Sequence, residues 1–155
     1  LIVNHATEGF LLADVLAERQ IPCIVGPLFT TRSKVELRER TLANPGLLAN
    51  AGVLVALTTD HPVVPINFLV HQATLAVKEG MSRDDALRSL TVNPAQMMGL
   101  ADRVGALEVG RDGDVAIWDG DPLDVMSRAR RVFVNGVSVY EWRDGAGVVS
   151  SPYRV

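Results

Sequence analysis

The stretch Val53-Leu54-Val55-Ala56-Leu57-Thr58-Thr59-Asp60-His61-Pro62 decides the fold class that this sequence predicts. It opens with a run of β-branched and aliphatic residues, which is typical of a strand buried on both faces in a parallel sheet. Asp60 would then lie at the carboxyl end of the strand, where α/β barrels keep their catalytic residues. The alternative is that Asp60 only caps the turn that follows.

The composition is that of an ordinary globular protein. The chain has 155 residues, of which 48% are hydrophobic and 21% are charged, and this length suggests about one domain or slightly more. The formal net charge of −3 gives no reason to expect a nucleic-acid partner. Arg128, Arg130 and Arg131 form the only dense basic cluster, which we interpret as a solvated or salt-bridged surface.

The sequence contains no uninterrupted apolar run of about 20 residues, so we expect no membrane span. Cys23 is the single cysteine and lies in an apolar stretch where a buried thiol is expected, so a reducing cytoplasm fits best. The chain has no initiator Met and begins within an expected strand, Leu1-Ile2-Val3. We therefore expect it to be a piece of a longer protein.

Strands and helices are expected to alternate as far as about Leu100. The expected strands cover 1–3, 21–25 and the run that ends at Asp60, and the expected helices cover 8–19, 45–51, 66–78, 84–90 and 95–100. Asn44 is a plausible N-cap, Ser82 opens a capping box, and Pro94 takes the first position of the last helix. This alternation predicts a parallel sheet.

From about Val104 the pattern changes to short strands with glycine turns, which predicts a small β module. Asn135-Gly136 is expected to form a type I′ turn within a hairpin over 131–140. The same region is rich in aspartates, but these lack the spacing of a calcium-binding loop and flank turns instead: Asp112, Asp114, Asp119, Asp121 and Asp124.

Few residues are candidates for a functional site. His5 follows the first expected strand, and Asp60 and His61 follow the third. A parallel barrel brings all of its strand ends to one face, and His and Asp side chains are typical zinc ligands. His71 lies within an expected helix among apolar neighbours, so we expect it to be packed and hydrogen-bonded.

Four segments together resemble the C-terminal part of the metal-dependent amidohydrolases, and the imidazolonepropionase-like subgroup is the most similar. The segments are Asn4-His5-Ala6-Thr7-Glu8-Gly9, Leu57-Thr58-Thr59-Asp60-His61-Pro62, Thr91-Val92-Asn93-Pro94-Ala95 and Gly105-Ala106-Leu107-Glu108-Val109-Gly110-Arg111-Asp112-Gly113-Asp114-Val115-Ala116-Ile117-Trp118. The resemblance covers nearly the whole chain, and the last two segments carry most of its specificity.

The resemblance implies an α/β fold in which residues 1–103 supply the last three strands of a (β/α)₈ TIM barrel and residues 104–155 supply part of a small β-sandwich. Asp60 matches the aspartate that binds the metal and carries a proton from the hydrolytic water to the leaving group. His5 matches a histidine that binds a second metal in binuclear members and contacts the substrate in mononuclear ones. Both outcomes stay open for His5.

The implied reaction is hydrolysis of an amide, cyclic amide or peptide-like C–N bond in a small molecule. A divalent metal, with zinc as the first choice and one or two ions in the complete enzyme, lowers the pKa of a bound water while an adjacent carboxylate accepts its proton. From position alone, His61 could contact the substrate, and Arg32 with its neighbours Ser33 and Lys34 could bind an anionic group; a solvated loop is the alternative.

The chain departs from the family pattern because the metal ligands of the earlier barrel strands are absent from it. His5 and Asp60 are fewer than the three protein ligands that a catalytic zinc site usually needs. We therefore expect the isolated chain to be inactive without the N-terminal part of the barrel. The competing interpretation is a non-catalytic assembly subunit, and the sheet edge left open predicts a homo-oligomer.

Overall fold

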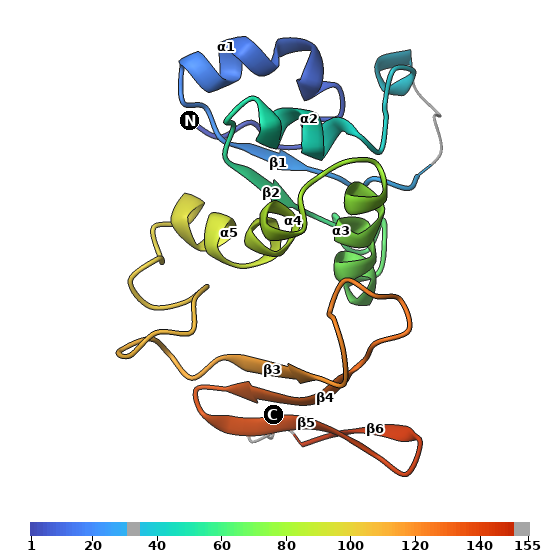
Figure 1. Ribbon diagram of the computed structural model, residues 1–155, viewed down its shortest axis with the longest axis vertical. Coiled ribbons are helices and arrows are strands. Elements are labelled where there is room, and N and C mark those ends of the chain that lie inside the picture. The colour runs from blue at the N-terminus through green and yellow to red at the C-terminus, as the bar shows by residue number, and fades with distance from the viewer. Residues whose placement is uncertain (31–34, 151–155) are drawn as a thin grey trace.

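The structure is a computed structural model that describes residues 1–30 and 35–150 (Figure 1). The first described elements are η1 (Gly9–Leu12), α1 (Ala13–Glu18), β1 (Cys23–Val25), η2 (Val35–Leu37), α2 (Asn44–Asn50) and β2 (Val55–Leu57). They are followed by η3 (Ile66–Phe68), α3 (Leu69–Lys78), α4 (Arg83–Leu90) and α5 (Val92–Met97). The last are β3 (Val115–Trp118), β4 (Ala129–Val134), β5 (Val137–Arg143) and β6 (Ala146–Val149).

The predicted parallel pairing of strands is confirmed. β1 and β2 are parallel neighbours with Cys23 opposite Val55 and Val25 opposite Leu57. The first expected strand is reduced to a single parallel bridge between Val3 and Cys23. Hydrogen bonds between this segment and β1 continue beyond that bridge: Ala6 N donates to Ile24 O at 3.0 Å. Three chain segments therefore run in parallel, with β1 in the middle.

The hydrophobic core lies between this parallel pair and the helices. In Figure 1, α1 and α2 lie above the strands and α3, α4 and α5 lie below them. Val25, Val55 and Leu48 of α2 are at most 1% exposed. Cys23 is also fully buried, as predicted, and desolvation raises the pKa of its thiol. Within the described ranges, no helix is both long enough and apolar enough to cross a bilayer.

Ser82 caps α4 as the sequence predicts. Its hydroxyl oxygen accepts a hydrogen bond from Asp85 N at 3.0 Å, and the hydroxyl donates to Asp85 Oδ2 at 2.6 Å. The predicted boundaries of the next helix were wrong, because α5 covers Val92–Met97 rather than 95–100. Pro94 still falls in the first turn of α5, where its missing N–H costs no intrahelical hydrogen bond.

The prediction that Asn44 caps α2 was also wrong. Ala43 is the N-cap residue, and Asn44 is the first residue of the helix. The buried amide of Asn44 reaches across to the segment that follows His5: its Nδ2 donates to Ala6 O at 2.7 Å, and its Oδ1 accepts from Phe10 N at 2.9 Å. Asn44 therefore fixes the path of the chain after the first parallel segment.

The β module is an antiparallel sheet in the order β3-β4-β5-β6, which lies apart from the parallel pair (Figure 1). Its strands begin at Val115, whereas the 104–114 segment forms turns. Asn135 and Gly136 have φ values of 50° and 76°, which confirms the predicted type I′ turn between β4 and β5. Arg130 pairs with Asp119 and Arg131 with Glu141, so this part of the basic cluster is salt-bridged.

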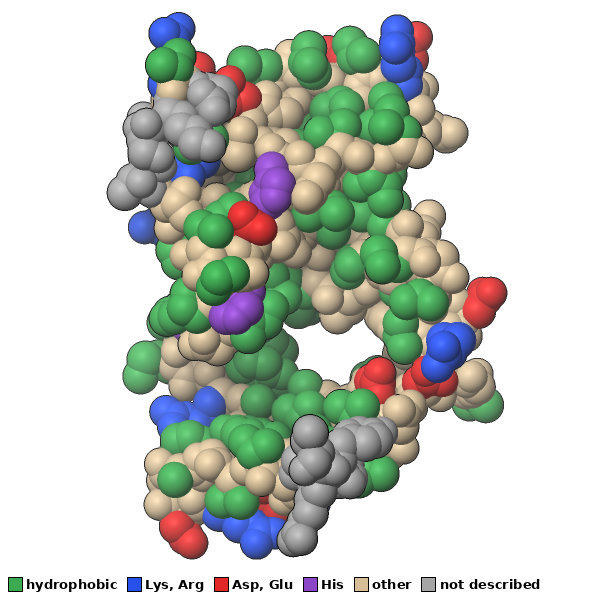
Figure 2. Space-filling model, turned by 180° about the vertical axis from the view of Figure 1, so that it is seen from behind, with side chains coloured by type: hydrophobic (Ala, Val, Ile, Leu, Met, Phe, Trp, Pro, Cys, Tyr) green, Lys and Arg blue, Asp and Glu red, His purple; other side chains and the backbone are tan. Residues whose placement is uncertain are grey.

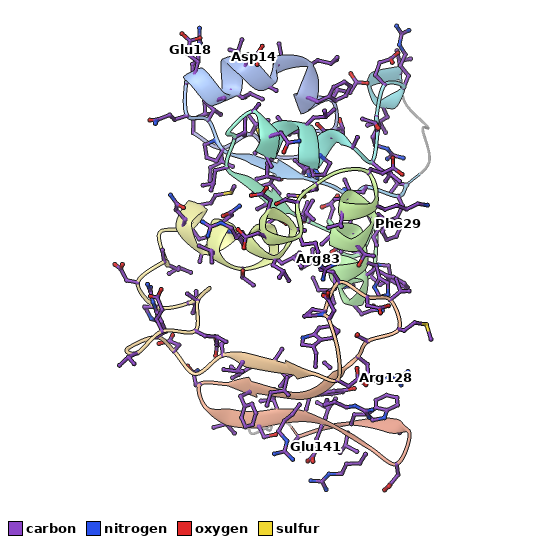
Figure 3. The ribbon with its side chains drawn as sticks, in the orientation of Figure 1. Asp14, Glu18, Phe29, Arg83, Arg128 and Glu141 are labelled. Carbon is purple, nitrogen blue, oxygen red and sulfur yellow. The ribbon has the colours of Figure 1, made fainter. Side chains whose placement is uncertain are left out.

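The loop between β3 and β4 attaches the sheet to the helices. Leu123 of this loop is 4% exposed and belongs to the main hydrophobic core, and Thr74 of α3 donates a hydrogen bond to its carbonyl at 3.0 Å. Arg83, labelled in Figure 3, extends from α4 and forms an ion pair with Asp121 of the same loop. One buried leucine and two polar contacts therefore hold the modules together at this point.

A cavity of about 680 Å³ remains between the helices and the sheet. Its lining is mainly apolar and comes from α3, α4, α5, the 100–107 segment and β3. Figure 2 shows the opening from behind, with hydrophobic side chains on both of its sides. The parallel strands and the candidate site residues take no part in this lining.

We predict that Leu48→Ala destabilises the fold much more than Leu47→Ala does. Both residues lie on α2, but Leu48 is 0% exposed and Leu47 is 45% exposed. Truncation of a buried leucine typically costs about 2–5 kcal/mol, because it loses transfer free energy and leaves a cavity. Urea unfolding followed by circular dichroism would measure both variants. Equal shifts of the two midpoints would contradict the proposed core.

Candidate active site

His5 and Asp60 lie next to each other at the carboxyl ends of the parallel segments. His5 Nε2 is 3.7 Å from Asp60 Oδ1, and the two side chains are 41% and 45% exposed. They are distant in sequence and come together because both follow strands of the same parallel arrangement. The structure thus brings together the two residues that the sequence singled out as metal ligands, on a surface that a small molecule can reach.

The ring of His5 is held by the backbone. Its Nδ1 lies 3.0 Å from the carbonyl oxygen of Gly26, which can only accept a hydrogen bond, so Nδ1 carries the proton. In neutral imidazole, Nε2 then keeps its lone pair, and it is the nitrogen that faces Asp60. A histidine that donates one ring N–H to a backbone carbonyl is a common arrangement among metal ligands.

Asp60 lies in a tight turn. Its φ is 50°, in the left-handed region that non-glycine residues seldom adopt. Its N–H donates to Thr58 Oγ1 at 3.1 Å, and its carbonyl oxygen accepts from Val63 N at 2.8 Å. Within the described part of the chain, its carboxylate accepts no backbone hydrogen bond. The interpretation of Asp60 as a capping side chain therefore has no support, and its carboxylate is available for chemistry.

His61 and Arg32 were also predicted to bind the substrate. His61 is exposed and follows Asp60 directly, and no hydrogen bond or ion pair joins it to His5 within the described residues. Arg32, with Ser33 and Lys34, lies outside the described residues.

His71 was predicted to be packed but is exposed. Its ring centre lies 5.4 Å from that of Phe68, and the Phe68 ring lies 6.2 Å from that of Phe29, beside α3 (Figure 3).

The aspartates of the β module hold turns, as the sequence predicts. Asp121 and Asp124 each accept a hydrogen bond from the backbone N–H two residues further on, and Asp114 accepts from Asn135 N. A hydrogen bond from Arg128 N and the nearby Arg130 guanidinium lower the pKa of the exposed Asp119. In the ranges that the structure describes, no three His, Cys, Asp or Glu residues form a metal-binding group.

His5 and Asp60 fit part of a metal site. Zinc binds histidine nitrogen and carboxylate oxygen at about 2.0–2.2 Å, so two ligands in tetrahedral geometry lie about 3.4 Å apart. The observed separation of 3.7 Å between His5 Nε2 and Asp60 Oδ1 is close to that value. The lone pair on Nε2 and the unoccupied carboxylate are donors of the right kind. Two donors are nevertheless fewer than the three that a catalytic zinc site usually takes from protein.

Two supporting residues were missed by sequence reasoning. Gln72 and Asn44 are buried amides, 0% and 1% exposed, which hydrogen-bond the segments on either side of the site. The available signal for Gln72 was a polar residue on the apolar stripe of a helix. Such a residue must find partners inside the protein when that stripe is buried.

Comparison with known proteins identifies the family of the chain. The family model described as "Amidohydrolase family" matches residues 13–140. The chain is 35% identical to the imidazolonepropionase of Sphingopyxis alaskensis over 96 residues, which cover 59% of this chain and 24% of that protein. The crystal structure of an amidohydrolase from Thermotoga maritima MSB8 is 44% identical, has a TM-score of 0.88, and is matched over 92% of this chain and 37% of its own.

A more distant match shows the fold alone. The crystal structure of an adenosine deaminase from Xanthomonas campestris, with bound zinc, is 21% identical, has a TM-score of 0.64, and is covered over 36% of its length. The chain spans well under half the length of each of these three proteins. The predicted fold is confirmed: the chain has the α/β structure of the C-terminal strands and helices of a TIM barrel with part of a small β domain. The chain belongs to the amidohydrolase family and is similar to its imidazolonepropionase members.

Proposed function

We propose that this chain is the C-terminal part of a metal-dependent hydrolase that cleaves a C–N bond in a small amide, cyclic amide or peptide-like substrate. Membership of the amidohydrolase family supports hydrolysis in general. The observation that carries the finer proposal is the pairing of His5 Nε2 with the Asp60 carboxylate at the carboxyl ends of parallel strands. In barrels of this type, catalytic residues come from the ends of different strands.

In this proposal, Asp60 Oδ1 helps to hold a divalent metal, for which zinc is the first choice, and His5 Nε2 helps to hold a second ion if the complete site is binuclear. When bound, such an ion lowers the pKa of a water molecule and polarises the scissile carbonyl group. The Asp60 carboxylate accepts a proton from the attacking water and then donates it to the leaving nitrogen, which departs as a neutral amine. His5 keeps its Nε2 lone pair toward the site because its Nδ1 proton is bonded to Gly26 O.

Two alternatives for His5 follow from the resemblance. It binds a second ion if the complete site is binuclear, and it contacts the substrate if the site holds one ion. The exposed side chain of His61 is proposed to reach the substrate. Arg32 is proposed to bind an anionic substrate group.

The fully buried Cys23 thiol fits a reducing compartment, and we propose that the protein lies in the cytoplasm.

The proposal includes a further part of the barrel. Among the described residues, β2 pairs only with β1, and the Val3 segment also pairs only with β1. Each of these outer segments thus has one edge without a strand partner, and such edges tend to pair with another chain segment. We propose residues 1–103 as barrel and 104–155 as part of the sandwich domain, and we propose that the whole protein is a homo-oligomer.

We predict that Asp60→Asn lowers turnover of the full-length protein by at least about a hundredfold, because the amide cannot carry the proton. Metal content by elemental analysis and hydrolysis of N-acyl amino acids, dipeptides and cyclic amides would be measured together. Asp102→Asn, which changes an exposed aspartate in a turn that follows α5, is the matched control and should keep turnover. A metal-free, inert parent protein, or a fully active Asp60→Asn variant, would contradict the proposed function.

We also predict that the 155-residue chain on its own shows no turnover and self-associates. It offers two metal ligands among its described residues, and its outer strand segments have unpaired edges. Light scattering and the same substrate panel would test both points. A monomer that hydrolyses any of these substrates would show that the rest of the barrel is unnecessary.

A further inference from the structure

We propose that Gln72 is a positioning residue for the metal site, and this inference rests on the proposed function. Gln72 belongs to α3 and is 0% exposed. Its Oε1 accepts a hydrogen bond from Leu28 N at 2.5 Å, and its Nε2 donates to Thr58 O at 2.7 Å. One side chain therefore connects the segment after β1 to the segment after β2.

Thr58 transmits this connection to Asp60. Its N–H donates a hydrogen bond to Val25 O at 3.0 Å, and its Oγ1 accepts one from Asp60 N at 3.1 Å. Its carbonyl oxygen is the acceptor for Gln72. A shift of the Thr58 peptide would therefore move the Asp60 turn directly.

Gly26 transmits the connection to His5. The Gly26 carbonyl accepts the Nδ1 hydrogen of His5, and Leu28, which Gln72 binds, follows two residues later. The backbones of Gly26 and Thr58 are in close contact, since a Cβ atom at Gly26 would lie 2.0 Å from Thr58 O. Gly26 also has a φ of +138°, which disfavours any other residue. Gln72 thus braces a contact that sets the spacing of the two proposed ligands.

The conformation of the two ligands explains why such a brace is needed. His5 and Asp60 have φ values of 53° and 50°, both in the left-handed region. Asp and His adopt this region more often than other non-glycine residues, but the conformation still costs free energy and is held by surrounding contacts. The hydrogen bond between Gln72 Oε1 and Leu28 N is buried, so removal of the amide leaves the Leu28 N–H without that partner in the interior. Loss of a group that hydrogen-bonds a metal ligand directly typically weakens metal binding by about 10–100-fold. Gln72 acts one step further out, through the backbone of Leu28 and Thr58, so its loss should weaken binding by less.

The test compares two isosteric substitutions in the full-length protein. Gln72→Met keeps the volume and removes both hydrogen bonds. Asn93→Leu is the matched control. Asn93 is 7% exposed, and its Nδ2 donates a hydrogen bond to Val55 O of β2 at 2.8 Å. Among the described residues, no hydrogen bond links Asn93 to His5 or Asp60. Gln72→Asn, which keeps the amide but is one methylene shorter, is a milder second variant. For each protein we would measure the midpoint of thermal unfolding, the zinc affinity in competition with a chelator, and the visible spectrum of the cobalt-substituted form.

We expect Gln72→Met to weaken zinc binding by up to about tenfold and to change the cobalt spectrum. Gln72→Asn should act in the same direction by a smaller factor. Asn93→Leu should lower thermal stability but leave zinc affinity and the spectrum as in the parent. If all three variants bind zinc equally well while Asp60→Asn does not, the inference about Gln72 is wrong and the proposed function stands. If the parent protein binds no metal, both are wrong.

Discussion

The close approach of the carboxyl ends of β1 and β2 is the constraint on which the rest of this structure depends. Parallel pairing places Val25 opposite Leu57, so the loops that follow both strands start from the same edge. At that edge Gly26 lies against the Thr58 carbonyl, with no room for a side chain between them. His5 hydrogen-bonds to Gly26, and Asp60 hydrogen-bonds to Thr58. The proposed metal ligands are therefore positioned by backbone contacts rather than by packing of their own exposed side chains.

Buried amides complete this arrangement from outside the strands. Gln72 joins the two strand ends, and Asn44 holds the segment after His5 through the carbonyl of Ala6. Each amide forms hydrogen bonds with backbone groups. Without these hydrogen bonds, each buried backbone group left unpaired would cost about 1–3 kcal/mol of stability. The site-bearing part of the chain is thus braced by α2 and α3. The antiparallel sheet is attached elsewhere, through Leu123 and the Arg83–Asp121 ion pair (Figure 3).

The meeting of His5 with Asp60 was predictable, because residues that follow parallel strands share one edge whatever their distance in sequence. The helix cap at Ser82 and the type I′ turn at Asn135-Gly136 were also predictable, because caps and turns of this type depend on the residues close to them in sequence. The role of Asn44 was not, because an asparagine before Pro45 fits a helix cap equally well and its partners lie in a distant segment. Gln72 shared a helical stripe with apolar residues, and only the tertiary structure shows which backbone groups it meets. His71 was wrongly predicted to be packed because the sequence does not show which side of α3 faces the strands.

Anomalous diffraction from crystals of the full-length protein grown with zinc tests the central claim most directly. Measured at the zinc absorption edge, the data would locate every ordered ion without reference to substrate or turnover. The account predicts a peak within about 2.0–2.2 Å of Asp60 Oδ1, with His5 Nε2 left to face the substrate, if the site holds one ion. With two ions, each of these atoms would bind one of a pair about 3.5–4 Å apart. An ordered zinc ion bound elsewhere, with His5 and Asp60 still paired only to each other, would contradict the account.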